Sequence, residues 1–337
     1  MFTVRATLGR IRRSLIRSLG GEVPGQVASQ GVVPSDYASL QQAIGAVLAP
    51  QVPTPLGLSI PEVEAMMRSI SLDGSPRGAL DAYVDDSLWR FLYSWNSLQG
   101  RTGSMLELGA NPYFTTMLLE SYCEAELTLA NYFGPTGALS GVQALSYTRP
   151  NGETWEKAMV FDHFDVEHDR FPYDDGSFDT VVFCEIIEHL LEDPVATLNE
   201  INRVLDDDGI LFLTTPNVAR LENILRLIAG ENLYDPYSGF GPYGRHNREY
   251  TMHDLATVLS FCGFSIEGAF TADSHPWMPS RPELVPVVAP YLQGRQHELG
   301  HYLFVTARKT SPPRVGRPSW LYRSLPEGEI VEWNSPG

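Results

Sequence analysis

The stretch Met105-Leu-Glu-Leu-Gly-Ala-Asn-Pro-Tyr113, which runs into Phe114-Thr-Thr-Met-Leu-Leu-Glu120, decides the fold class of this chain. An apolar run too short for a helix, ending in glycine and followed by residues of helical period, predicts a buried strand, a tight turn and a helix. Glycine lets the backbone approach a ligand closely, and the amino end of the following helix can receive negative groups. The stretch is therefore typical of the start of a nucleotide-binding α/β unit.

Further strands and helices alternate after this unit. The predicted strands cover residues 126–130, 159–164, 180–183, 210–214, 264–270 and 301–307. This alternation predicts a doubly wound, seven-stranded and mostly parallel sheet, a Rossmann-like α/β fold. The turn signal Pro150-Asn-Gly152 predicts a β-hairpin inserted at residues 141–160, which we expect to decorate the sheet.

The regions outside the sheet differ in composition. We expect a basic amphipathic helix at 1–20, a linker at 21–34, a helical cap at 35–100, the sheet domain at 101–308 with an acceptor-facing loop at 231–250, and a tail at 309–337. Five arginines and no acidic residue precede Glu22, so the first helix either lies on an anionic membrane surface, acts as a targeting peptide or packs on its own domain.

The net charge and the cysteine spacing argue against a nucleic-acid-binding protein and against a cysteine metal site. The 337 residues carry a formal net charge of −17, which disfavours binding to a nucleic-acid backbone. Cys123, Cys184 and Cys262 show no metal-binding spacing, and a reducing cytoplasm is the simplest setting for them. No apolar run approaches the ~20 residues of a membrane-spanning helix, so we expect a cytoplasmic protein with at most peripheral contact at the inner face of a membrane.

Polar residues gather where the predicted strands end. They are Glu107 with Gly109, Asn131, Asp165, Glu185 and Thr215-Pro-Asn217. Ligands of doubly wound sheets bind at the carboxyl ends of the strands. A carboxylate such as Glu107 can attract an ammonium group, Asp165 can accept from an amino group, and Val166 can pack on a flat base.

This pattern resembles the class I S-adenosylmethionine-dependent methyltransferases, in particular type 11 and type 23 proteins of bacterial glycan clusters. The resemblance covers about Leu80 to Arg308 and is carried by residues 106–109, 171–179, 185–189, 214–217 and 245–251. It implies S-adenosylmethionine as the cofactor and a cofactor site formed by Glu107, Gly109, Ala110, Asn111, Asn131, Tyr132, Asp165, Val166 and Cys184. The chain departs from the family at Asn111 and Tyr113, where small residues are usual, and at Asn131, where an acid is usual.

An acid and histidine constellation follows the fourth predicted strand. Glu185, Glu188 and His189 have the spacing i, i+3 and i+4, which puts them on one side of a helical turn, and His246 lies on the 231–250 loop. The set resembles the residues around a divalent ion in small-RNA 3′-terminal 2′-O-methyltransferases and, for the first three, in ubiquinone-pathway O-methyltransferases. Its imidazoles suit Mn²⁺, Fe²⁺ or Zn²⁺ better than Mg²⁺. One alternative is a metal-free site in which His189 or His246 acts as general base. Another is that Glu185 touches the cofactor or substrate, Glu188 is solvated and His189 is a satisfied helix residue.

The resemblance implies a methyltransferase (EC 2.1.1.-) that acts on a hydroxyl oxygen. A glycan, glycan-lipid or other small-molecule acceptor is our first expectation, as in polysaccharide biosynthesis, because aromatic residues alternate with glycine along residues 234–244. An RNA 3′-terminal 2′-O-methyltransferase with a Glu/Glu/His/His metal site is one alternative. A non-catalytic binding module with a degenerate methyltransferase fold is another.

Overall fold

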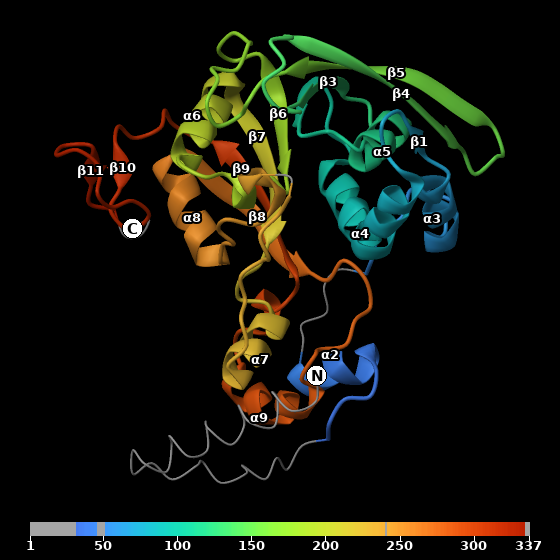
Figure 1. The fold of residues 1–337 in the computed structure, drawn as a ribbon, viewed down its shortest axis with the longest axis vertical. Coiled ribbons are helices and arrows are strands. Elements are labelled where there is room, and N and C mark those ends of the chain that lie inside the picture. Colours follow the sequence, from blue (N-terminus) through green and yellow to red (C-terminus); the bar gives the residue numbers. More distant parts are fainter. Residues whose placement is uncertain (1–31, 46–50, 240, 334–337) are drawn as a thin grey trace.

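The computed structural model describes residues 32–45, 51–239 and 241–333. Its centre is a nine-stranded sheet with the order β1-β4-β5-β3-β2-β6-β7-β9-β8 (Figure 1). The strands are β1 (Ser71–Leu72), β2 (Ser104–Leu108), β3 (Glu126–Asn131), β4 (Ser140–Thr148), β5 (Thr154–His163), β6 (Phe178–Cys184), β7 (Leu205–Pro216), β8 (Phe264–Ala272) and β9 (Tyr302–Lys309). The predicted α/β class with a mostly parallel central sheet is confirmed.

The middle of the sheet is parallel. β2 pairs in parallel with β3 on one side and with β6 on the other, while β5 and β7 continue the parallel arrangement outward. β9 runs antiparallel between β7 and β8. The chain therefore reverses its direction of winding beside β2, and such a switch point leaves a crevice at the carboxyl ends of the strands.

The predicted hairpin forms, but it extends the sheet rather than decorating it. β4 and β5 pair antiparallel from Ser140↔Asp162 to Thr148↔Thr154, around the turn at Pro150-Asn-Gly152. The end of β5 also pairs with β3, and β1 adds to the outer edge of β4. Because β4 and β1 are added beyond β5, the sheet has nine strands instead of the seven expected.

Helices cover both faces of the sheet. α3 (Ile60–Arg68), α4 (Arg77–Leu98) and α5 (Phe114–Tyr122) pack on one face against residues such as Met105, Val182 and Phe212. α6 (Pro194–Val204) and α8 (Met252–Phe261) pack on the other face against neighbouring positions such as Leu106 and Val181. Adjacent strand residues thus belong to different cores, as the two-residue period of a strand requires.

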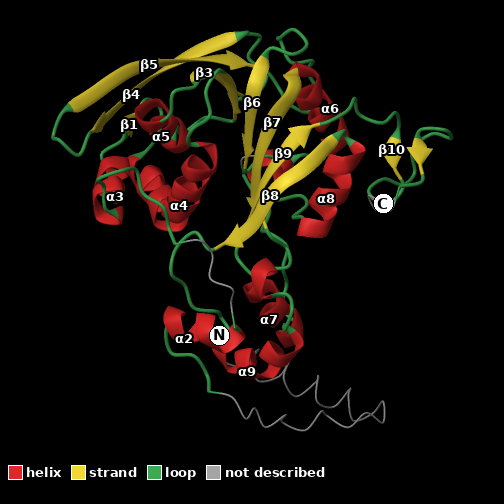
Figure 2. Ribbon diagram, turned by 180° about the vertical axis from the view of Figure 1, so that it is seen from behind, coloured by secondary structure: helices red, strands yellow, loops and turns green. Residues whose placement is uncertain are grey.

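A separate helical cluster lies below the carboxyl ends of β7 and β8 (Figures 1 and 2). It contains α2 (Tyr37–Ile44), α7 (Leu221–Ala229) and α9 (Val285–Val288), whose apolar side chains form a third core. The expected cap region 35–100 is thus divided, because α2 joins this cluster whereas α4 is part of the layer on the sheet. The domain boundaries drawn from the sequence stay a prediction.

The structure describes the C-terminal segment up to residue 333 but not the predicted N-terminal helix. The basic segment 1–20 lies outside the described residues. The C-terminal segment contains the small pair β10 (Arg317–Pro318) and β11 (Ile330–Val331), and Arg317 and Tyr322 bind the carboxylate of Asp193 at the start of α6. No helix within the described ranges combines the length and the apolar character needed to cross a membrane.

Candidate functional site

A cavity of about 420 Å³ opens at the carboxyl ends of β2, β3, β5 and β6. Eight residues predicted as site residues line it, namely Gly109, Asn111, Asn131, Tyr132, Asp165, Val166, Glu185 and His189. Tyr83, Ala130, Phe164, Ile186, Leu190 and Tyr243 complete the lining. Apolar walls with a few polar groups are typical of small-molecule sites, and the position matches the crevice that the strand order creates.

Three predicted cofactor residues do not line this cavity. Glu107 is buried and its carboxylate accepts a hydrogen bond of 2.6 Å from Thr116 in α5. Because side chains alternate along β2, Glu107 faces the α5 layer together with Met105, and burial raises its pKa to about 8. Ala110 is buried in the core on the same side, and Cys184 packs against that core without lining the cavity.

The turn after Gly109 is stabilised by side chains rather than by further glycines. The Asn131 Oδ1 atom accepts a hydrogen bond of 2.8 Å from the Asn111 backbone N–H, and its amide donates to the Tyr113 hydroxyl at 3.1 Å. Tyr113 and Asn111 both donate to Gln143 of β4. Tyr113 is fully buried, so it supports the turn from below and does not close over a ligand. Asn131, at the end of β3, thus stabilises the turn formed by Asn111 and Tyr113.

The opposite end of the cavity lies against the 231–250 loop. Asp165 accepts from the Glu167 backbone N–H at 2.9 Å and lies 3.1 Å from His168 Nδ1. Tyr243, in the short helix Pro242–Gly244, donates its hydroxyl to Glu167 at 3.1 Å. The loop therefore closes this end of the cavity through one aromatic side chain.

A second cavity of about 250 Å³ adjoins the first. It is lined by one face of α4 with Ala82, Tyr83, Asp86, Ser87 and Arg90, and by Glu185, Glu188, His189, His246 and Tyr302. Tyr83, Glu185 and His189 line both cavities. The two spaces consequently meet beside a carboxylate and an imidazole.

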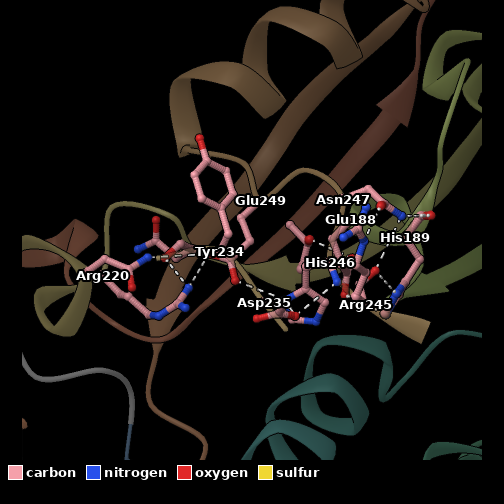
Figure 3. Close-up of polar contacts among 12 residues, drawn as sticks. Glu188, His189, Arg220, Tyr234, Asp235, Arg245, His246, Asn247 and Glu249 are labelled. Carbon is pink, nitrogen blue, oxygen red and sulfur yellow. Dashed lines mark hydrogen bonds and ion pairs between the residues drawn. The ribbon is translucent and has the colours of Figure 1, made fainter. Parts of the chain in front are cut away.

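The structure brings Glu188, His189 and His246 together, as Figure 3 shows. One potential ligand atom from each lies within 4.8 Å of the other two, and the imidazole rings meet edge to face with centroids 5.1 Å apart. Hydrogen bonds from the Asn247 and Arg248 backbones to the Glu188 carbonyl dock the loop on the short helix Ile187–His189. That docking carries His246 across 57 positions of sequence to His189.

Neighbouring groups orient the imidazoles. His189 Nδ1 lies 3.0 Å from the Arg245 carbonyl, which fixes the proton on Nδ1 and leaves Nε2 3.9 Å from Glu188 Oε1. His246 Nδ1 lies 3.1 Å from Glu249 Oε1, whose other oxygen binds Arg220 at 2.5 Å. A carbonyl or carboxylate on one ring nitrogen sets the tautomer and leaves the other nitrogen for a proton or a metal.

Burial and nearby charges shift the pKa values of His189, His246 and Glu188 in different ways. Burial and the adjacent His246 lower the pKa of His189. Burial also opposes protonation of His246, but its hydrogen bond to Glu249 and the charge of Asp235 outweigh that effect and raise its pKa. Burial raises the pKa of Glu188, and the neighbouring Glu185 carboxylate adds to this effect. Groups whose pKa values are moved apart in one site are suited to acid and base roles.

Glu185 does not join this group, in contrast to the expected four-residue set. Its backbone has a positive φ of 55°, so it precedes the helical turn instead of forming part of it. One carboxylate oxygen accepts from Thr214 at 2.8 Å and the other faces Arg90 Nε at 3.9 Å. The spacing i, i+3 and i+4 placed Glu185 on the helical face only on the assumption that the helix starts directly after β6.

The donor set fits a divalent metal. Glu188 is fully buried, its Oε2 accepts from Thr215 at 2.8 Å, and its Oε1 has no hydrogen-bond partner among the described residues. An orphaned buried carboxylate oxygen beside two oriented imidazoles is the arrangement that Mn²⁺, Fe²⁺ or Zn²⁺ would satisfy. Metal binding at these three residues stays a prediction.

Several residues that line the two cavities or support their walls were not predicted as site residues. They include Tyr83, Arg90, Gln143, Arg220, Tyr243 and Glu249. Arg90 had a detectable signal, because it lies in α4 between apolar residues such as Leu88 and Phe91. Tyr83 lies on the same helix, and the remaining four come from β4 of the hairpin, the start of α7 and the 231–250 loop, whose positions depend on long-range packing.

Part of the sheet domain is similar in sequence to a known protein family. Residues 116–213 match the sequence model of a family described as a methyltransferase domain. This segment resembles methyltransferase domains, and the match covers 98 of the 337 residues. It runs from within α5 to within β7 and includes part of the lining of the larger cavity and the residues from Glu185 to His189.

The similarity to whole proteins is low. No curated protein matches the chain. Similar solved structures include a SAM-dependent methyltransferase from Archaeoglobus fulgidus, with 14% identity, coverage of 70% of this chain and 95% of that one, and a TM-score of 0.40. Another is the 1,6-didemethyltoxoflavin-N1-methyltransferase of Burkholderia thailandensis, with 18% identity, coverage of 79% and 94%, and a TM-score of 0.40.

Proposed function

We propose that this protein transfers a methyl group from S-adenosylmethionine to a hydroxyl oxygen. The observation that carries the proposal is the junction of the two cavities at Glu185 and His189. The larger cavity would hold the cofactor, with Val166 against the adenine and Asn131 near the ribose. The smaller cavity would hold the acceptor beside His189.

In this arrangement the protein acts mainly by alignment. Two reactants held in neighbouring cavities need little further loss of freedom to react. S-adenosylmethionine supplies the methyl group, and the acceptor oxygen loses its proton as it forms the new bond. His189 is suited to take that proton, because its lowered pKa keeps Nε2 unprotonated near neutral pH and the Arg245 carbonyl holds the ring in place.

A divalent metal is the alternative way to manage the proton. Glu188, His189 and His246 would hold it, and it would lower the pKa of an acceptor hydroxyl. Both versions use the same side chains, so a chelator separates them. Unchanged turnover in excess chelator, with no metal in the purified protein, would exclude the metal version and leave His189 as base.

We propose a glycan or a glycan-lipid intermediate as the acceptor. Support comes from the loop beside the site, where Tyr234 is 84% exposed and Tyr237 is 92% exposed. The Arg245 guanidinium lies 4.8 Å from the Tyr237 ring centre, which fixes one aromatic face at the loop surface. Exposed aromatic faces of this kind stack on sugars.

Calorimetry with S-adenosylhomocysteine tests the cofactor site directly. We expect binding to the wild-type protein and its loss in Val166→Glu, because that substitution puts a charge where the adenine would pack. Val160→Glu is the matched control, since Val160 is 62% exposed on β5 and lies outside both cavities. Absence of binding to wild type at high micromolar ligand would favour a non-catalytic module with a degenerate methyltransferase fold.

The second candidate function is 2′-O-methylation at an RNA 3′ terminus. The cluster of Glu188, His189 and His246 favours it, because a metal there could bind both terminal hydroxyls. The net charge of −17 opposes it, since an RNA backbone would meet an acidic surface. Methyl transfer to a short RNA that is abolished by chelator and by His246→Ala would support this function over the glycan acceptor.

A further inference from the structure

Arg90 is a buried cation that the proposed mechanism does not use. It lies on α4 and is only 6% exposed, and its side chain lines the smaller cavity. Arginine is rarely buried to this extent without partners, because its guanidinium carries five N–H donors and a permanent charge. The groups around Arg90 therefore show whether its N–H donors have acceptors within the protein.

The described residues leave the guanidinium poorly satisfied. Its Nε has no hydrogen-bond partner, and the nearest carboxylate oxygen, on Glu185, lies 3.9 Å away. That distance is too long for a hydrogen bond. The other neighbours are aromatic, with the ring centres of Phe91 and Tyr302 at 4.8 and 5.4 Å. These rings hold the guanidinium in place without satisfying its donors.

Glu185 cannot serve Arg90 fully from its present position. One of its oxygens is held by Thr214 at 2.8 Å, and the positive φ of its backbone fixes the direction of the side chain. Asp86 and Ser87, one helical turn before Arg90, also line the cavity, but no hydrogen bond joins either side chain to Arg90 among the described residues. The Arg90 side chain thus lines the space in which the acceptor would sit, and within the described ranges its charge is paired only at 3.9 Å, by Glu185.

We propose that Arg90 binds an anionic oxygen group, a carboxylate or a phosphate, on the methyl acceptor. This inference rests on the proposed function and names the chemical class of the acceptor: a hydroxyl-bearing molecule that also carries an acidic group. A planar guanidinium accepts two oxygens of such a group side by side. Because His189 and His246 line the same cavity as Arg90, an acceptor anchored at its acid would present a hydroxyl to the imidazoles.

Binding of defined sugars to the complex with S-adenosylhomocysteine tests the inference. The probes are glucuronate, glucose 6-phosphate and neutral glucose, with binding followed by ligand-observed NMR. We expect at least one charged sugar to bind and glucose to bind at least roughly tenfold more weakly, the effect of losing charge-assisted hydrogen bonds. The two charged probes distinguish a carboxylate acceptor from a phosphate acceptor.

Variants at Arg90 show whether this residue causes the preference for a charged sugar over glucose. Arg90→Met should abolish the preference for the charged sugar, and Arg90→Lys should retain a weaker preference, because it keeps the charge and loses the paired geometry. Arg170→Met is the matched control, since its side chain is 74% exposed and lies away from both cavities. Circular dichroism and S-adenosylhomocysteine binding show that each variant is folded.

The possible outcomes separate the two proposals. If S-adenosylhomocysteine does not bind, the methyltransferase proposal fails. If it binds but no charged sugar is preferred, or if the preference survives in Arg90→Met, the assignment of Arg90 is wrong and the cofactor site stands.

Discussion

Replacement of Gly109 by alanine is expected to destabilise the fold and to weaken cofactor binding. Gly109 has a positive φ of 65°, a conformation that costs an ordinary residue about 1–2 kcal/mol. A Cβ there would also lie 2.8 Å from Ile186 Cδ1. Since Cδ1 is the movable end of a side chain, crowding should add only about 1 kcal/mol, the low end of overpacking costs.

The movement of Ile186 connects stability to function. Both Gly109 and Ile186 line the larger cavity, so a side chain displaced by the new Cβ would intrude on the space for S-adenosylhomocysteine. Gly100→Ala is the matched control. Gly100 has a φ of 78°, and a Cβ built on it meets nothing within 4 Å, so it should show the backbone cost alone and leave cofactor binding unchanged.

Urea unfolding followed by tryptophan fluorescence measures these differences, and calorimetry measures the binding. In an Ile186→Val background the clashing Cδ1 is absent and only the 3.3 Å contact with Cγ1 remains, so the cost of Gly109→Ala should fall close to that of Gly100→Ala. The reasoning is refuted if Gly109→Ala costs no more than Gly100→Ala in the wild-type background. It is equally refuted if Ile186→Val gives no recovery.

Two further predictions concern the loop. In Glu249→Gln the pKa of His246 should fall in an NMR titration, because the carboxylate that favours the protonated ring is lost. Because the pKa of His246 is higher in the folded than in the unfolded protein, its protonation stabilises the wild-type fold at low pH, and this stabilisation is lost as the pH rises through the folded-state pKa. The loss of stability in Glu249→Gln should therefore become smaller with rising pH. An unchanged pKa of His246 in the variant would contradict the assignment. Tyr243→Phe should weaken S-adenosylhomocysteine binding by up to roughly tenfold in calorimetry, since it removes the bond to Glu167 that closes the cavity; equal affinity would show that the loop closes without it.

Local sequence patterns predicted the sheet strands and much of the larger cavity. Strand ends carry polar residues in any doubly wound sheet, so Asn131, Asp165 and Glu185 could be placed at one edge without coordinates. Glu107 shows the limit of this reasoning, because the direction of a side chain at a strand end depends on the register of the strand and on the helix behind it. Here α5 supplies Thr116 as the partner of its carboxylate.

The sequence by itself determined the α/β class, the strand at whose end the larger cavity lies and the residues that could supply acid, base or metal chemistry. These features depend on spacing along a few residues. The tertiary structure alone decided that His246 meets His189, that Glu185 pairs with Thr214 and Arg90, that the hairpin extends the sheet and that Arg90 lines the second cavity. Each of these contacts joins elements far apart in the chain, and their packing is set by cores that no local pattern encodes.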